Sequence, residues 1–494
     1  MKSHTQYTQL TLDAFRSSLS GLSKSNRWVV MGDTLPWAEI EKLYNSKLHN
    51  QLTGAGNKPA RMVVGALIIK HKMNLSDEET ILAIRENPYM QYMLGLSEFT
   101  DRPVFDSSLF VSIRKRLQTE DLNSFTLRLL SAEHPVQEGK DGKDEDSGSS
   151  GDGSFTDSQG RLHKGSIKID ATCCDAEVRY PTDVDLLEDG SRVINSYLVK
   201  ICREASLACP STYRKRCRIA YPDFIKKKKK SRTMVNGCKS LLLNGLSHDI
   251  RTFIRVVAVH GTRLLDGLGR YEKRTLRAII TMYHQQETMF SQGTNSIADR
   301  IVSIFQPHIR PIVRGKSKSP VEFGAKIGVS VVEGYTFIDN LSWDAYNEHA
   351  DLRTQIELYR QRFGCLPSKV YADKIYMSRE NRTLMKGQEI QAMGKPSGRP
   401  PKNPGQEYEK EMALAAGKRN EVEATFGTGK RVYRGNEIRA KLPETANCWI
   451  GMCYFAKNVM KFIKGFLHLL LEIGSWMKNP ALESRKLECK AGFL

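Results

Sequence analysis

The sequence has few cysteines for its length, and none is spaced for metal binding. Ten cysteines are spread over 494 residues, and no two form a Cys-x-x-Cys pair. We therefore expect neither a zinc site nor a disulfide framework, as is typical of proteins of the reducing cytoplasm. The first residues, Met1–Gln6, are polar, so the sequence predicts no signal peptide here.

Long uninterrupted hydrophobic runs are also missing. The most apolar late stretch, residues 449–476, is broken by charged side chains that include Lys457, Lys461 and Lys464. This pattern favours an amphipathic helix over a transmembrane span. We expect no membrane partner for this chain.

Acidic residues are clearly outnumbered by basic ones. The chain has 75 Lys and Arg against 55 Asp and Glu, which gives a net charge of +20. Such an excess predicts a polyanionic partner, because each phosphate that a cation neutralises releases a condensed counterion. Anionic membranes and structural RNA fit the same composition, so charge alone does not identify an enzyme.

The order of helix and strand patterns predicts an α/β protein with a mixed sheet, preceded by an all-helical domain. In the helical part, Ser76 and Glu79 form a capping-box pattern. Strands are predicted at 166–178, 252–260, 321–332 and 369–372, and helices between them at 186–207 and 270–300. We divide the chain into a helical domain (1–135), a flexible acidic linker (136–165), an α/β domain (166–460) with a helical, basic insertion at about 184–310, and a helical C-terminal tail (461–494).

Three acidic residues have sequence contexts that suit metal-binding carboxylates. Asp170 and Asp373 each end a short strand pattern, and Glu423 lies in a helical segment. Two strand-end aspartates and a helical glutamate are a common way to hold a pair of Mg²⁺ ions for phosphodiester chemistry. If the three converge in space, the chain is an enzyme acting on nucleic acid.

Other carboxylates compete for these roles. Glu421 lies about 200° around the helix from Glu423, so only one of the two can face the site. For an isolated Arg-x-x-x-Glu pattern, surface ion pairing along an exposed helix is usually the better explanation. Three acids close to Asp170 in the sequence are rival ligands: Asp175, Asp183 and Asp185.

Several basic residues are candidates for contacts with a phosphate backbone. Arg419 and Lys430 fall in the same helical sector as Glu423. Other candidates lie in a Gly-Arg-Pro segment, a lysine tract and a predicted helix end, namely Arg399, Lys226, Lys227, Lys228, Arg114 and Arg116. For each group a structural explanation stays open: a proline-rich linker, a solvated charge run, or cations that offset a helix dipole.

The joint order of these motifs resembles the DDE transposases of bacterial insertion sequences, in particular the insertion sequence five superfamily. The resemblance covers roughly residues 30–460. The motifs that carry it are Asp170-Ala-Thr, Tyr180-Pro-Thr-Asp183, Arg314-Gly-Lys316, Glu322-Phe-Gly-Ala-Lys326, Ala372-Asp-Lys374, Gly398-Arg-Pro-Pro-Lys402 and Glu423 with Phe426-Gly427. The chain departs from the family pattern at Ala416, where the family has tyrosine, and at Ile375, often glycine in the family.

The resemblance implies an RNase H-like catalytic core in which Asp170, Asp373 and Glu423 bind two Mg²⁺ ions, with Mn²⁺ as a substitute. It implies that Arg419 and Lys430 contact phosphates. The expected partners are double-stranded DNA, as terminal inverted repeats and target, and a second copy of the chain on that DNA. We expect the protein in the bacterial cytoplasm, associated with the nucleoid.

Other functions stay open from the sequence. A related metal-dependent DNA nuclease would cleave strands without joining them. A catalytically inactive DNA-binding protein descended from a transposase would keep only the DNA contacts. A structural RNA-binding protein would explain the charge but not the three acids.

Overall fold

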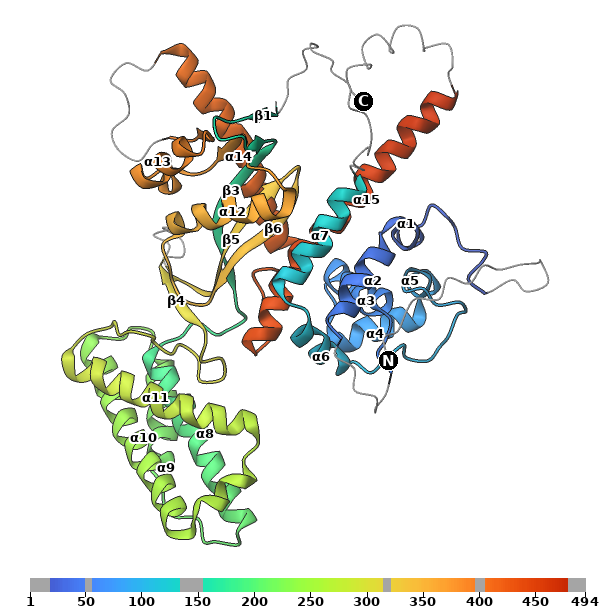
Figure 1. Ribbon diagram of the computed structural model, residues 1–494. Helices are drawn as coiled ribbons and strands as arrows, with labels where there is room; N and C mark the ends of the chain where they lie inside the picture. The colour runs from blue at the N-terminus through green and yellow to red at the C-terminus, as the bar shows by residue number, and fades with distance from the viewer. Residues whose placement is uncertain (1–17, 49–55, 134–153, 314–320, 396–404, 479–494) are drawn as a thin grey trace. The chain divides into compact units, whose positions relative to one another are not determined.

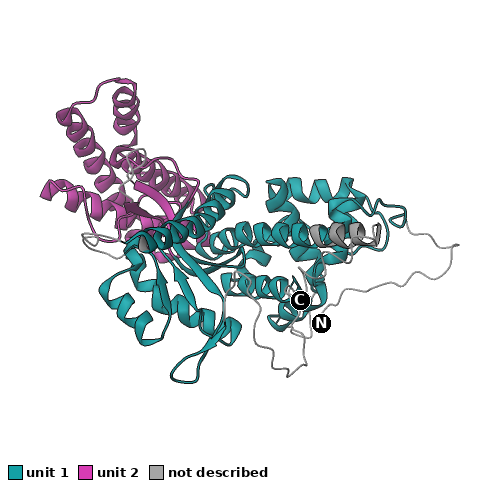
Figure 2. Ribbon diagram, turned by 90° about the horizontal axis from the view of Figure 1, so that it is seen from above, with its two compact units in different colours: residues 1–174, 326–341, 346–494 teal, residues 175–325, 342–345 magenta. Residues whose placement is uncertain are grey.

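The structure, a computed structural model, describes residues 18–48, 56–133, 154–313, 321–395 and 405–478. The chain divides into two units, coloured separately in Figure 2. The first unit comprises residues 1–174, 326–341 and 346–494, and the second comprises residues 175–325 and 342–345. We describe each unit by itself.

The N-terminal part of the first unit is helical, as the sequence predicts. Its helices are α1 (Arg27–Thr34), α2 (Trp37–Ser46), α3 (Ala60–Met73), α4 (Asp77–Glu86), α5 (Pro88–Met93), α6 (Leu109–Arg116) and α7 (Thr119–Glu133) (Figure 1). The capping box before α4 is confirmed: the Glu79 N–H donates to Ser76 Oγ at 3.1 Å, and the Ser76 N–H donates to Glu79 Oε2 at 2.8 Å.

The long helix α15 (Pro443–Lys478) packs against these N-terminal helices. Gly451 on α15 lies so close to α7 that a Cβ atom in its place would meet Leu122 Cδ1 at 2.6 Å. One turn further, Phe455 packs on Phe125 with ring centroids 5.8 Å apart. A segment from the C-terminal part of the chain therefore completes the core of the N-terminal helices.

One buried side chain of α15 links these helices to the sheet. The Asn458 amide donates to Thr126 Oγ1 on α7 at 3.1 Å and to the Thr336 carbonyl on the sheet at 2.7 Å. Its Oδ1 accepts a hydrogen bond from the Thr336 N–H at 3.0 Å. Asn458 is fully buried, so loss of these bonds would leave buried polar groups without partners.

The sheet of the chain is mixed, which confirms the predicted α/β class. Its strands are β3 (Ser166–Asp175), β4 (Arg310–Val313), β5 (Val321–Val332), β6 (Tyr335–Ser342), β7 (Lys369–Tyr371) and β8 (Gln391–Met393). The order is β4-β5-β3-β7-β8, with β6 paired to β5. Strand β7 runs parallel to β3 and β8, whereas β4 and β5 are antiparallel. The associated helical elements of the first unit are η3 (Glu348–Ala350), α12 (Asp351–Phe363), η4 (Lys374–Tyr376), α13 (Arg379–Gly387) and α14 (Gln406–Arg431).

The second unit is mostly helical. Its helices are α8 (Asp183–Glu204), α9 (Arg214–Lys226), α10 (Arg232–His260) and α11 (Arg270–Gln292). Residues 252–260, predicted as a strand, form the end of α10, so this prediction is wrong. The segment is rich in β-branched residues, but Leu242, Leu246 and Phe253 on α10 are buried in the hydrophobic core of the unit. Tertiary packing therefore overrides local strand preference.

The expected linker ends earlier than the sequence suggests. Residues 134–153 lie outside the described part of the chain, but β1 (Phe155–Thr156) and β2 (Leu162–His163) pair as a short antiparallel hairpin. The Phe155 ring stacks on the His163 ring at 4.5 Å, and Asp157 Oδ2 lies 3.0 Å from His163 Nε2. A buried hydrogen bond and one aromatic contact thus order a segment whose composition favours flexibility.

The apolar stretch at residues 449–476 lies within α15, as predicted. Among the described residues, no helix combines the length and the hydrophobicity needed to cross a lipid bilayer. The charges that interrupt the stretch are used within the first unit: Lys457 Nζ donates to the Gly334 carbonyl at 2.8 Å, and Lys461 Nζ lies 2.8 Å from Glu133 Oε2.

Candidate active site

Asp170 lies in the middle of the sheet, on β3. The strand is buried along most of its length because Ile167 and Ile169 belong to the hydrophobic core. Asp170 Oδ1 accepts a hydrogen bond from the Ala171 N–H at 2.8 Å. The pKa of Asp170 is raised to about 6, mainly by burial and also by the negative charges of Glu348 and Asp373.

Asp373 follows β7, the parallel neighbour of β3. The register pairs Ser166 with Lys369 and Lys168 with Tyr371, an offset of 203 residues, and the same offset sets Asp373 level with Asp170. Adjacent strands are about 4.8 Å apart. Only Asp373 follows the end of its strand: β3 continues to Asp175, so the expectation that Asp170 ends a strand is wrong. The parallel pairing of β3 with β7 still brings the two acids together on neighbouring strands.

Asp373 also has a local structural contact that the sequence did not suggest. Its Oδ1 accepts a hydrogen bond from the Lys374 N–H at 2.7 Å, so it caps the short helix η4. The next helix, α13, has its own cap in Ser378. The side chain of Asp373 is half exposed.

Arg419 on α14 joins two of the three acids. Its Nη1 lies 2.6 Å from Asp373 Oδ1, and its Nη2 lies 3.0 Å from Glu423 Oε1. Arg419 also acts electrostatically on Asp170, whose pKa it lowers against the effect of burial. One guanidinium therefore bridges the carboxylates of Asp373 and Glu423 and acts electrostatically on Asp170.

The rival acid Glu421 has a different partner. Its Oε2 lies 2.5 Å from Nζ of Lys168, which is almost fully buried on β3. Because side chains two residues apart on a strand share a face, this ion pair shows that α14 covers the face of β3 that carries Asp170. A lysine on an otherwise apolar strand was the signal for this pair, since a buried charge requires a partner.

Two of the three rivals of Asp170, Asp183 and Asp185, take part in ion pairs of the second unit. Asp183 Oδ2 lies 2.7 Å from Lys239 Nζ, and its Oδ1 lies 2.5 Å from Arg300 Nη2. Asp185 Oδ1 accepts a hydrogen bond from the Tyr221 hydroxyl at 2.6 Å. These contacts explain the two carboxylates without a metal.

The basic residues singled out in the sequence have varied environments. Arg114 is buried, and its guanidinium makes a bidentate ion pair with Asp77 at 2.6–2.8 Å, so its charge is used inside the helical part and not at the surface. Arg116 is exposed and donates to Asn57 Oδ1 at 3.3 Å. Lys430 is half-buried on α14. The tract Lys226, Lys227 and Lys228 is fully exposed at the end of α9, and Arg399 lies outside the described residues.

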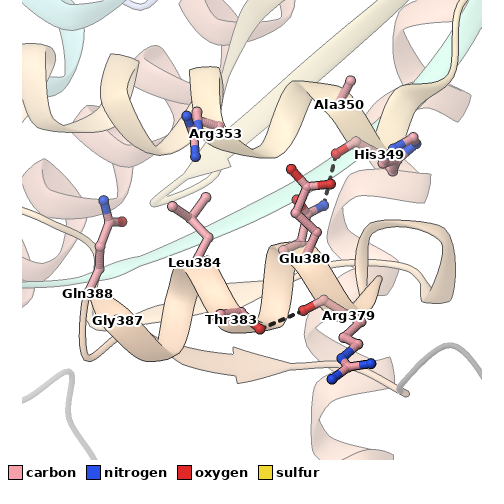
Figure 3. Close-up of a pocket in the computed structure, with 10 residues that line it drawn as sticks. His349, Ala350, Arg353, Arg379, Glu380, Thr383, Leu384, Gly387 and Gln388 are labelled. Atoms are coloured by element: carbon pink, nitrogen blue, oxygen red, sulfur yellow. Dashed lines mark hydrogen bonds between the residues drawn. The ribbon is translucent and has the colours of Figure 1, made fainter.

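A groove of about 950 Å³ lies between α12 and α13, next to η3. Figure 3 shows Arg353 reaching from α12 and Arg379 from the first turn of α13. Both arginines are exposed, and within the described residues neither guanidinium has a hydrogen-bond or ion-pair partner, whereas the Arg379 carbonyl accepts a hydrogen bond from the Thr383 hydroxyl at 3.0 Å. The Asn381 amide donates to the His349 carbonyl at 2.8 Å, which fixes α13 to the rim formed by η3. No local sequence pattern indicates this groove, because its two arginines lie 26 residues apart on different helices.

The chain matches two family models. A transposase domain (DUF772) matches residues 17–116, and a transposase DDE domain matches residues 370–459. The second range includes Asp373, Arg419 and Glu423. Together the two matches support a DDE transposase, a kind of DNA-binding protein that acts in DNA transposition and recombination.

One curated relative shares part of the sequence. The uncharacterized protein ORF8 in the nfe locus of Rhizobium meliloti is 29% identical over 128 residues, which are 26% of this chain. The chain spans 60% of the length of that relative. No solved structure matches the chain.

Proposed function

We propose, with the two transposase-domain matches as the premise, that this protein is a DNA transposase of the insertion sequence five superfamily. It would bind the terminal inverted repeats of an insertion sequence, cleave DNA strands at their ends and join them to target DNA. The observation that carries the proposal is the contact of one guanidinium, that of Arg419, with both Asp373 and Glu423 beside Asp170. The parallel pair β3–β7 and the covering helix α14 support an RNase H-like core.

The donor set of this site fits a hard divalent cation. Asp170, Asp373 and Glu423 offer only carboxylate oxygens, which Mg²⁺ and Mn²⁺ prefer. Two of these side chains, Asp373 and Glu423, already contact one positive charge, that of Arg419. A pair of bound Mg²⁺ ions would stabilise the attacking and leaving oxygens of a phosphodiester. Asp170, Asp373 and Glu423 would hold these ions.

Arg419 would exchange partners during the reaction. Once its carboxylates are neutralised by metal, the guanidinium has no further role between them and can bind a DNA phosphate in a bidentate manner. Lys430, on the same helix, would contact the same strand. Arg419 thus keeps the acids from repelling one another in the metal-free protein and would hold the substrate in the loaded one.

The proposed partner is double-stranded DNA, with two copies of the chain holding two ends. The N-terminal helices and the exposed lysine tract Lys226–Lys228 would contact the inverted repeats. The groove between α12 and α13 begins next to η3. The negative charge of Glu348, which lies in η3, raises the pKa of Asp170. Arg353 and Arg379 would therefore bind phosphates of the strand that leaves the site.

A cleavage and joining assay tests the function. The full-length protein is incubated with Mg²⁺ and DNA that carries both element ends. Asp373→Asn should abolish cleavage but leave end binding intact, whereas Glu357→Gln, at a half-exposed acid on α12 outside the groove, should retain both activities. Cleavage by Asp373→Asn at the wild-type rate would contradict the assigned role.

The same assay separates the alternatives. Pre-cut ends supplied with a target plasmid should give joined products, and a nuclease without strand transfer would give none. An inactive DNA-binding protein would bind the ends but leave every strand intact, whatever metal is added.

A further inference from the structure

Glu348 is a fourth carboxylate beside Asp170 that the sequence did not single out. It begins η3, immediately before α12, and its side chain is mostly buried. Its Oε2 lies 3.3 Å from Nζ of Lys326 on β5. The negative charge of Glu348 raises the pKa of Asp170 more than the negative charge of Asp373 does.

One amide holds Glu348 and the Asp373 segment together. Asn381 Nδ2 donates to the His349 carbonyl of η3 at 2.8 Å and to the Tyr376 carbonyl of η4 at 2.9 Å. Asn381 is itself buried. The helix η3, which carries Glu348, and the helix η4, which Asp373 caps, are therefore fixed against each other.

The hydroxyl of Tyr376 is directed into this group of acids without a hydrogen bond. Tyr376 is fully buried, and within the described residues its hydroxyl has no hydrogen-bond partner. Burial and the charges of Glu348, Asp170 and Asp351 raise its pKa, so the phenol stays protonated and remains a donor. A buried, unpaired hydroxyl costs about 1–3 kcal/mol. Phenylalanine would fill the same space without that cost, which calls for a functional explanation.

We propose that Glu348 is a fourth oxygen ligand of the divalent-cation site, directly or through a metal-bound water, and that the Tyr376 hydroxyl positions it. The inference rests on the proposed function, since it assigns a further ligand to the same site. Lys326 would act as the built-in counter-ion of Glu348 in the metal-free protein. In the loaded protein the Tyr376 hydroxyl would donate to a carboxylate oxygen of Glu348 or Asp170 and fix its direction.

Metal binding without DNA tests this inference. Mn²⁺ is titrated into full-length protein by calorimetry, with wild type, Glu348→Gln, Tyr376→Phe and the matched control Glu357→Gln. Glu348→Gln should weaken Mn²⁺ binding by about tenfold or more, and Tyr376→Phe by about tenfold. Glu357→Gln, at a half-exposed acid on α12 that pairs with Arg360, should bind like wild type.

Thermal unfolding in EDTA separates positioning from folding. Tyr376→Phe removes an unpaired buried hydroxyl, so its melting temperature should stay level or rise while metal affinity falls. A purely structural tyrosine would leave the Mn²⁺ affinity unchanged, and that result would overturn its role.

A second variant distinguishes a metal ligand from a simple ion-pair partner. Lys326→Met keeps the Glu348 carboxylate but removes its counter-ion, so Mn²⁺ should bind several-fold more tightly. If both Lys326→Met and Glu348→Gln bind Mn²⁺ with wild-type affinity, Glu348 is not a metal ligand. If wild-type protein itself binds no Mn²⁺, the proposed function fails; if wild type binds and Glu348→Gln matches it, only this inference fails.

Discussion

The histidine at position 71 should make the protein sensitive to acid. His71 lies on α3, fully buried against the Trp449 ring of α15 at 5.3 Å, with its Nδ1 3.7 Å from Cys453 Sγ. Within the described residues, its Nε2 has no hydrogen-bond partner. Burial, together with the positive charges of Lys70 and Arg114, lowers the pKa of His71 to about 3.

The sign and size of the effect follow from this pKa. In the unfolded chain the histidine binds a proton below about pH 6.5, whereas in the folded protein it stays neutral down to about pH 3. The unfolded state therefore binds more protons in this window, and the free energy of unfolding falls as the pH drops from 6.5 to 3. From pH 6.5 to pH 5 the loss is about 2 kcal/mol, at about 1.4 kcal/mol per pH unit.

Urea unfolding followed by tryptophan fluorescence measures this loss at pH 7.5 and pH 5. His71→Phe keeps a ring against Trp449 but cannot titrate, so its stability should fall by about 2 kcal/mol less than that of wild type over this range. Any constant effect of the larger ring cancels in the comparison of the two pH values. His284→Phe, at an exposed histidine, should follow wild type. Parallel profiles for wild type and His71→Phe would refute the reasoning.

Three further predictions concern the site, the groove and the second unit. Arg419→Met should bind Mn²⁺ more tightly in the absence of DNA, because no guanidinium competes for the carboxylates; calorimetry measures this. The variant should also cleave DNA about 10²-fold more slowly in a time course. Cleavage at the wild-type rate would contradict the role of Arg419. The double variant Arg353→Ala, Arg379→Ala should reduce the steepness with which the logarithm of the DNA-binding constant falls against the logarithm of the salt concentration, by about 2. Arg382→Ala, on α13 but outside the groove, should leave this slope unchanged. Equal slopes for wild type, the double variant and Arg382→Ala would exclude the groove as a DNA path. Asp183→Asn leaves two cations without a carboxylate and should destabilise the second unit by about 3 kcal/mol in urea unfolding, so a loss below 1 kcal/mol would show that this ion-pair cluster contributes little.

Local signals in the sequence predicted the elements that depend on local contacts. The capping box at Ser76 depends only on residues a few positions apart, and so does the alternating pattern that predicts a strand leading into Asp170. Both elements are present in the structure. The segment 252–260 shows the limit of such signals. Its β-branched residues favour a strand, but α10 continues through it because its buried face packs on α8.

The site could be predicted in part for the same reason. Asp170 and Asp373 were visible because each follows a short strand pattern, and parallel pairing brings the two strands together. The pattern misplaced the end of β3, which continues through Asp170 to Asp175. The use of Arg114 inside the helical part was not visible, because its partner Asp77 lies 37 residues away. Glu348 gave no signal either, since its closeness to Asp170 depends on how η3 and η4 are clamped by Asn381. Ion pairs and hydrogen bonds between distant segments decide these roles.

The packing of α15 on α7 has a consequence for how the chain folds during synthesis. Leu122 and Phe125 face Gly451 and Phe455, more than 300 residues later in the sequence. A nascent chain that has emerged only as far as residue 135 therefore exposes an apolar surface on α7, and this surface stays uncovered until α15 leaves the ribosome. The N-terminal helices would thus gain their full stability late, when almost the whole protein has been translated.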